Sequence, residues 1–128
     1  VPGLLEDVEV PASQVVVLDV DTAKLGHIRV YGKLQWLPGV RATLTAKSLQ
    51  VFGSLEAGTS AAPFEGRAVI ALWGSPDEPP VQMAPGTPWG SKVLGVLGNL
   101  TLHGRAFARA WSRLAATAEV GAQELVVE

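Results

Sequence analysis

The sequence predicts an all-β domain, a stack of short strands in the manner of a parallel β-helix or β-solenoid with long proline- and glycine-rich loops. Three observations predict it: a motif that repeats along the chain, a high glycine and proline content, and short runs of β-branched and apolar residues. Of the 128 residues, 48% are hydrophobic, which is enough for one domain with a sizeable core. Fourteen glycines and nine prolines are too many for a helical bundle.

The strongest signal is the repeat. The pattern apolar-x-Val-apolar-Gly-x-Leu occurs at residues 28–34, 49–55 and 94–100. Strand alternation turns the first, third and seventh positions inward, and it also turns the glycine inward, where a side chain would collide or the strand must bend. The first two copies are 21 residues apart, about one coil of a β-solenoid, so each copy is expected to stack on the one before it.

Other strands are predicted between these copies. Residues 14–20 are β-branched and apolar, residues 41–46 alternate with Ala42, Leu44 and Ala46 inward, and residues 67–73 form a further run. Loops are predicted at residues 37–39, 57–60 and 74–90. The last contains five prolines and cannot form a central strand or a helix interior.

Residues 106–119 are ambiguous. Apolar side chains recur there at helical spacing on an alanine-rich background, which favours one short helix. A strand and loop is the alternative.

Charge and composition exclude several classes. The net charge is −2, so no basic surplus is present to bind nucleic acid. No apolar run is long enough to cross a membrane, and the absence of cysteine excludes disulfides, thiolate zinc sites and cysteine nucleophiles in residues 1–128. The start at Val1 and the strand-like end at residues 125–128 lead us to expect a single domain, residues 1–128, excised from a larger protein.

A set of motifs in a fixed order resembles the G-eight domain, a family named for eight glycines. The motifs are residues 10–20, 25–34, 49–58, 62–64, 68–74, 92–96, 100–104 and 111–114. Ser112 stands where members usually have Thr, and Trp73 stands where many have Thr. The resemblance implies structural roles for Gly26, Gly32, Gly53, Gly58, Gly74, Gly95, Gly98 and Gly104.

The resemblance also implies an extracellular location, as part of a secreted protein or of the ectodomain of a membrane-anchored one, followed by β-helix repeats of the same chain. Residues 111–117 are most similar to the fibrocystin-type members. We therefore expect a non-catalytic module that is structural and binds a glycan or protein ligand. Two alternatives stay open: the N-terminal part of a hyaluronan-degrading enzyme, as in other members of the family, and a homotypic adhesion or assembly module.

Four residues are candidate ligand contacts. Trp89 lies in the proline-rich loop beside Lys92, and Trp36 lies at a predicted strand end near Arg41. Exposed aromatic rings often mark binding surfaces, and here they would offer a platform for a sugar ring. Packing in the core is the alternative for each tryptophan, and it is the expected role of Trp73 and Trp111. Asn99 begins an Asn-Leu-Thr sequon on an outward face and is the candidate glycosylation site.

The remaining polar residues form no recognisable catalytic or metal-binding pattern. His27 and His103 do not occupy equivalent repeat positions, so each is expected to hold structure through hydrogen bonds. Asp19 and Asp21 project to the same side of a strand end, which favours a solvated cap over a Ca²⁺ site. The basic residues before position 48 are spread along the chain. We expect no catalytic residue, no metal and no cofactor.

Overall fold

The computed structural model describes residues 3–109 and 111–128, and the fold is all-β, as the sequence predicts. The described residues contain twelve short strands and no helix. The strands are β1 (Val8–Val10), β2 (Val15–Leu18), β3 (His27–Val30), β4 (Lys33–Trp36), β5 (Arg41–Ala46), β6 (Ser48–Val51), β7 (Ser54–Ala57), β8 (Arg67–Leu72), β9 (Gln82–Ala84), β10 (Thr87–Pro88), β11 (Leu94–Val96) and β12 (Asn99–Leu102).

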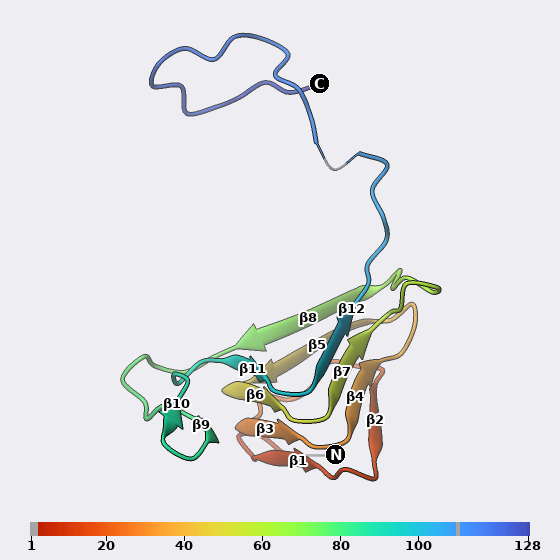
Figure 1. Ribbon diagram of the computed structural model, residues 1–128, viewed down its shortest axis with the longest axis vertical. Helices are drawn as coiled ribbons and strands as arrows, with labels where there is room; N and C mark the ends of the chain where they lie inside the picture. Colours follow the sequence, from red (N-terminus) through yellow and green to blue (C-terminus); the bar gives the residue numbers. More distant parts are fainter. Residues whose placement is uncertain (1–2, 110) are drawn as a thin grey trace.

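Ten of these strands form three parallel sheets around a common interior (Figure 1). The first sheet has the order β1-β3-β6-β11, the second has the order β2-β4-β7-β12 read from its other edge, and the third pairs β5 with β8. The chain visits the sheets in turn, so each passage adds a strand beside the one laid down before it. The fourth sheet is a separate antiparallel pair of β9 and β10.

The strand register confirms the three-copy repeat. Leu49 on β6 pairs with Ile28 on one side and with Leu94 on the other. In the second sheet, Leu55 pairs with Leu34 and Leu100 in the same way. The three copies therefore lie directly over one another, although 45 residues separate the second start from the third.

The core lies between the three sheets and consists of the inward positions of the repeat. Leu49, Val51 and Leu55 are fully buried. Ala42, Leu44 and Ala46 on β5 are buried and alternate with partly exposed threonines, as predicted. Fully burying one Leu or Val side chain contributes about 1.5–3 kcal/mol, so these stacked rows stabilise the fold.

Glycine is required at the corner between the first two sheets. A Cβ on Gly53 would overlap the carbonyl oxygens of Tyr31 and Gly32 in the layer below, and one on Gly98 would overlap those of Phe52 and Gly53. The Gly53 N–H donates to Val30 O over 2.9 Å, which brings the two backbones this close. The corner therefore excludes a side chain because of the backbone of the preceding layer.

Two predicted strands end early. The strand predicted over residues 14–20 ends at Leu18, because Asp21 and Thr22 turn to bond the backbone of β5. The strand predicted over residues 67–73 ends at Leu72, although the Trp73 backbone N–H still donates to Ala46 O over 3.1 Å.

Two segments differ more from expectation. The predicted loop over residues 74–90 contains the β9–β10 hairpin, which turns at Pro85-Gly86 with Gly86 at φ 73°. The short helix considered for residues 106–119 is absent from its described residues, and residue 110 lies outside them. Leu114 forms an antiparallel bridge with Val127, and Ser112 Oγ donates to Glu128 O. Trp111 is 62% exposed, so its prediction as a core residue is wrong.

Candidate functional site

Side chains of the N-terminal layer accept hydrogen bonds from backbone N–H groups of β3 and β5. Asp7 Oδ1 accepts the His27 N–H over 2.7 Å, and Asp21 Oδ1 accepts the Thr43 N–H over 2.7 Å. Thr22 Oγ1 accepts the Thr45 N–H over 3.0 Å. Free backbone groups on an edge strand pair readily with another chain, so the bonds from Asp21 and Thr22 block that pairing at two positions of the edge strand β5.

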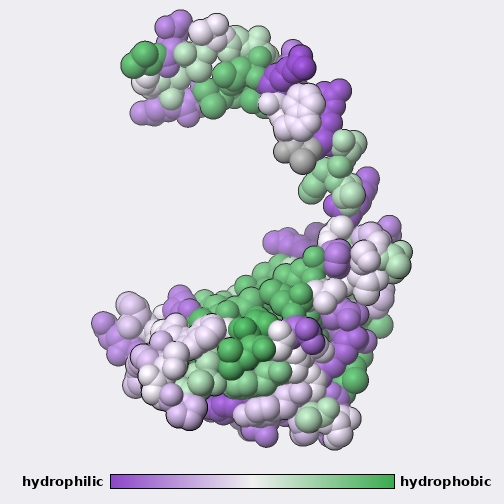
Figure 2. All heavy atoms as spheres, viewed as in Figure 1, coloured by the Kyte–Doolittle hydropathy of each residue, from purple (hydrophilic) through white to green (hydrophobic). Residues whose placement is uncertain are grey.

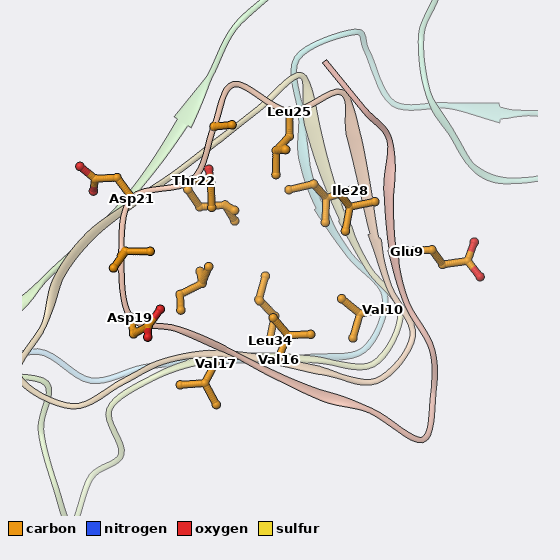
Figure 3. Close-up of a pocket in the computed structure, with 15 residues that line it drawn as sticks. Glu9, Val10, Val16, Val17, Asp19, Asp21, Thr22, Leu25, Ile28 and Leu34 are labelled. Carbon is orange, nitrogen blue, oxygen red and sulfur yellow. The ribbon is translucent and has the colours of Figure 1, made fainter. Parts of the chain in front are cut away.

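A cavity of about 370 Å³ opens at the same end, between β1, β2 and residues 19–25. Figure 3 shows the side chains of Val10, Leu25 and Ile28 directed toward it and that of Glu9 directed away. Most of its lining is valine, leucine and isoleucine. Such a lining can hold an apolar group, but it offers few partners to a polar one.

The C-terminal end of the sheets is uncovered. Leu100 and Leu102 on β12 are 45% and 53% exposed, whereas their partners Leu55 and Ala57 on β7 are 0% and 5% exposed. Figure 2 shows hydrophobic surface gathered in this region. In the part of the chain that the structure describes, no side chain caps a backbone N–H of β8, β11 or β12. The two ends of the body therefore differ at the third sheet: Asp21 and Thr22 bond the edge of β5, and no side chain bonds the edge of β8 among the described residues.

A cluster around Trp73 was not predicted. Lys24 Nζ and Lys47 Nζ lie 4.1 Å and 4.9 Å from the centroid of the Trp73 ring, and the indole N–H donates to Leu25 O over 2.9 Å. Lys47 also bonds Glu78 over 2.9 Å, and this hydrogen bond is the main cause that lowers the pKa of the Glu78 carboxyl. The cluster fastens the base of the insertion formed by residues 74–93 to the sheets.

The strand register contained the signal for this cluster. Positions on β5 and β8 pair at an offset of 26 residues, and Trp73 follows Lys47 by the same 26. Lys24 lies one layer before Lys47, because it forms a parallel bridge with Thr45, two residues before Lys47 in the chain. The basic residues that are spread along the sequence therefore converge in part: Lys24 and Lys47 meet at Trp73, while Lys33 pairs with Glu56 over 2.9 Å.

The four predicted ligand contacts do not form one site. Trp89 is 40% exposed and Lys92 is exposed, and both lie in the insertion. Trp36 is only 3% exposed and its indole N–H donates to Ala42 O, so its prediction as a surface platform is wrong. Arg41 is exposed at the start of β5, at the far end of that strand from the insertion (Figure 1).

The predicted glycosylation site and the two histidines lie in different surroundings. Asn99 is exposed on the outward face of β12, and His27 Nδ1 lies 2.8 Å from Ser48 Oγ. The exposed His103 joins the layers through its backbone, which bonds Ala57 O and the Phe64 N–H.

The glycines beyond the corner positions fall into two groups. A Cβ would meet a neighbouring layer or side chain at Gly26, Gly32, Gly58, Gly74 and Gly95. At Gly104 it would meet nothing within 4 Å. Among the described residues, no group of three or more His, Cys, Asp or Glu could hold a metal ion.

These features define an all-β module of three parallel sheets and one antiparallel hairpin, with apolar side chains exposed at its C-terminal end. The chain matches the model of the G8 domain family over residues 1–115, and it belongs to this family. No solved structure matches it significantly. Among the described residues, the structure has no helix long and apolar enough to span a membrane.

Relatives from three mammals support the assignment. The chain is 34% identical to fibrocystin-L of Mus musculus over 118 residues and 31% identical to fibrocystin-L of Homo sapiens over 124 residues. These matches cover 90% and 94% of this chain. It is also 32% identical to fibrocystin of Canis lupus familiaris over 132 residues, a match that covers the whole chain. The chain spans only 3% of the length of each of these proteins.

Proposed function

We propose that this chain is the first section of a longer parallel β-helix in an extracellular protein and that its role is structural. In this proposal each passage through the three sheets is one coil, and the N-terminal layer, in which Asp21 and Thr22 bond the edge of β5, starts the stack. The open C-terminal end receives the next coil of the same chain. The observation that carries the proposal is the exposure of Leu100 and Leu102, which occupy inward positions that are buried one layer below.

Covering these side chains is energetically favourable. A fully buried leucine contributes about 1.5–3 kcal/mol relative to an exposed one. Leu100 and Leu102 are each about half exposed, so a further coil stabilises the end by about 1.5–3 kcal/mol for the pair. A further coil would also form backbone hydrogen bonds with β8, β11 and β12, and these bonds add to the stabilisation. A repeat architecture requires such neighbour contacts, since no coil buries its inward face alone.

The extracellular location rests on the family resemblance, which implies a secreted protein or the ectodomain of a membrane-anchored one. The insertion of residues 74–93 is the proposed ligand contact. It projects beyond β8 in Figure 1, and it carries the exposed Trp89 together with Lys92. Trp89 would pack on the apolar face of a sugar ring or of a protein side chain, and Lys92 would bind an anionic group.

The test compares the 128-residue chain with the natural chain extended by two further coils, about 42 residues at the repeat length. Hydrogen exchange of the β11 and β12 amides is the direct measurement. We expect these amides to become protected in the longer chain and its Tm to rise by about 5–10 °C. If the β12 amides exchange hydrogen at the same rate in both chains, the proposal is contradicted.

Two controls sharpen the test. Leu100→Asp should abolish the added protection, because it places a charge between coils. Arg41→Gln, at an exposed position outside the open end, should leave it intact. A homotypic module is the competing candidate, since a second copy could cover the same open end. Sedimentation equilibrium distinguishes the two: a mass that rises with concentration and is restored to the monomer value by Leu100→Asp favours self-assembly.

A further inference from the structure

Asn99 presents its side chain to solvent beside an apolar corner of the fold. It begins β12, where it pairs with Ser54 of β7, which in turn pairs with Lys33 of β4. Thr101, the third residue of the sequon, pairs with Glu56 and lies on the same outward face. Lys33 and Glu56 form an ion pair on this face. Both sequon positions that matter for glycosylation therefore point away from the core.

The corner beside Asn99 carries a ridge of apolar side chains, formed by Tyr31, Phe52 and Leu97. Each residue occupies the same place in its layer, because each backbone N–H donates to the equivalent valine carbonyl one layer below, over 2.8–2.9 Å. The rings of Tyr31 and Phe52 stack with their centroids 4.9 Å apart and their planes 12° apart. Tyr31 is 41% exposed and Leu97 is 53% exposed, so the ridge remains open to solvent.

The ridge lies next to the sequon in the chain and in space. Leu97 is two residues before Asn99, and only Gly98, which has no side chain, separates them. The corner at Gly98 is as tight as the backbone allows, since a Cβ there would overlap the carbonyl oxygens of Phe52 and Gly53. A group attached to Asn99 therefore starts two residues from Leu97, in the layer next to that of Phe52.

We propose that Asn99 carries an N-linked glycan whose first N-acetylglucosamine residues pack on the ridge of Tyr31, Phe52 and Leu97. The apolar face and the acetamide methyl of the sugar cover the exposed leucine and the aromatic edges, which removes apolar surface from water. The occupant is a glycan because the sequon tethers one at this spot. The glycan faces sideways from the stack, so a further coil on β12 does not displace it.

The modification is a glycosyl transfer from a polyprenyl-diphosphate-linked oligosaccharide, which the secretory route supplies. The bond between the anomeric carbon and the diphosphate oxygen breaks, and a bond from that carbon to Asn99 Nδ2 forms. The amide nitrogen loses one proton, and the polyprenyl diphosphate leaves. The inference rests on the proposed function in one respect, namely that the chain enters this route.

The experiment expresses the chain behind a secretion leader in mammalian cells and analyses both the medium and the cell-retained pool. Asn99 is the only asparagine in the sequence, so an N-glycan on the chain identifies this site. Intact mass before and after amidase treatment measures occupancy. Thr101→Ala should abolish the glycan, and the matched variant Thr101→Ser should retain it, since Ser also completes the sequon.

Packing on the ridge is measured separately, by Tm of the glycosylated and the enzymatically deglycosylated protein. We expect removal of the glycan to lower the Tm by about 2–4 °C in the unaltered chain, and by less than about 1 °C in Leu97→Ala, where the contact is reduced. Asn99 without glycan in both pools would overturn the proposal, and so would an equal Tm change in both proteins. A glycosylated chain that never leaves the cell would support the glycan and count against the extracellular role.

Discussion

Replacing Gly53 by alanine tests how the layers are spaced. The added Cβ would overlap Gly32 O and Tyr31 O, and it would lie 2.7 Å from the Tyr31 carbonyl carbon. All three are backbone atoms, so no side chain can rotate away to make room. The two layers must separate at this corner, which stretches the bonds from the Gly53 N–H to Val30 O and from the Ser54 N–H to Gly32 O, both 2.9 Å.

The cost can be worked from these contacts. Weakening two backbone hydrogen bonds costs about 1–3 kcal/mol, and forcing an extra carbon into a packed site costs about 1–3 kcal/mol. Gly53→Ala should therefore lower the free energy of unfolding by about 2–6 kcal/mol. At roughly 4 °C per kcal/mol for a domain of this size, the Tm should fall by about 8–24 °C.

Urea unfolding followed by circular dichroism measures this effect, and Gly104→Ala is the matched control. A Cβ on Gly104 would meet nothing within 4 Å and its φ is not positive, so the control should change stability by less than about 0.5 kcal/mol. If Gly53→Ala were as stable as Gly104→Ala, the inference that backbone contact between layers requires glycine would be wrong.

Three further predictions concern packing, charge and activity. Leu55→Ala should cost about 2–5 kcal/mol in urea unfolding because Leu55 is fully buried, whereas Leu100→Ala should cost less than about 1 kcal/mol in the 128-residue chain. The Lys47–Glu78 pair stabilises the fold above the ordinary carboxyl pKa of 4.5, because the pKa of Glu78 is lower in the folded state, and this contribution is lost as pH falls through the folded value. Glu78→Gln should therefore be less stable than the unaltered chain at neutral pH and equal to it in acid; a difference that persists in acid would refute the assignment. Long hyaluronan incubated with the chain should keep its length on a sizing column, and shortened polymer would instead support the enzyme alternative.

The repeat and the inward residues could be predicted because they depend on local properties of the chain. Alternation along a strand and a spacing of 21 residues are visible in the sequence, and the pairing of Ile28 with Leu49 and of Leu49 with Leu94 confirms them. The third copy is recognisable in the sequence despite the intervening insertion, since the motif itself recurs.

The surroundings of individual aromatic residues could not be predicted in the same way. Trp36 lies at a predicted strand end and Trp89 lies in a predicted loop, and both are candidates for an exposed platform. Only Trp89 is exposed, whereas Trp36 is buried. Trp111 recurs at helical spacing with its neighbours, yet the described part of its segment forms no helix. Spacing alone does not decide between helix and strand in a short apolar segment, and burial depends on what stacks above and below.

The sequence by itself determined the fold class, the order of the layers and the family, because a repeated apolar pattern and its glycines specify stacking wherever the copies occur. Only the tertiary structure decided that Lys24 and Lys47 meet at Trp73 and that Asn99 lies beside an apolar ridge. It also decided that Asp21 and Thr22 bond the edge of β5 while Leu100 and Leu102 stay exposed at the other end. Each of these features joins residues from different layers, and such contacts exist only once the layers are stacked.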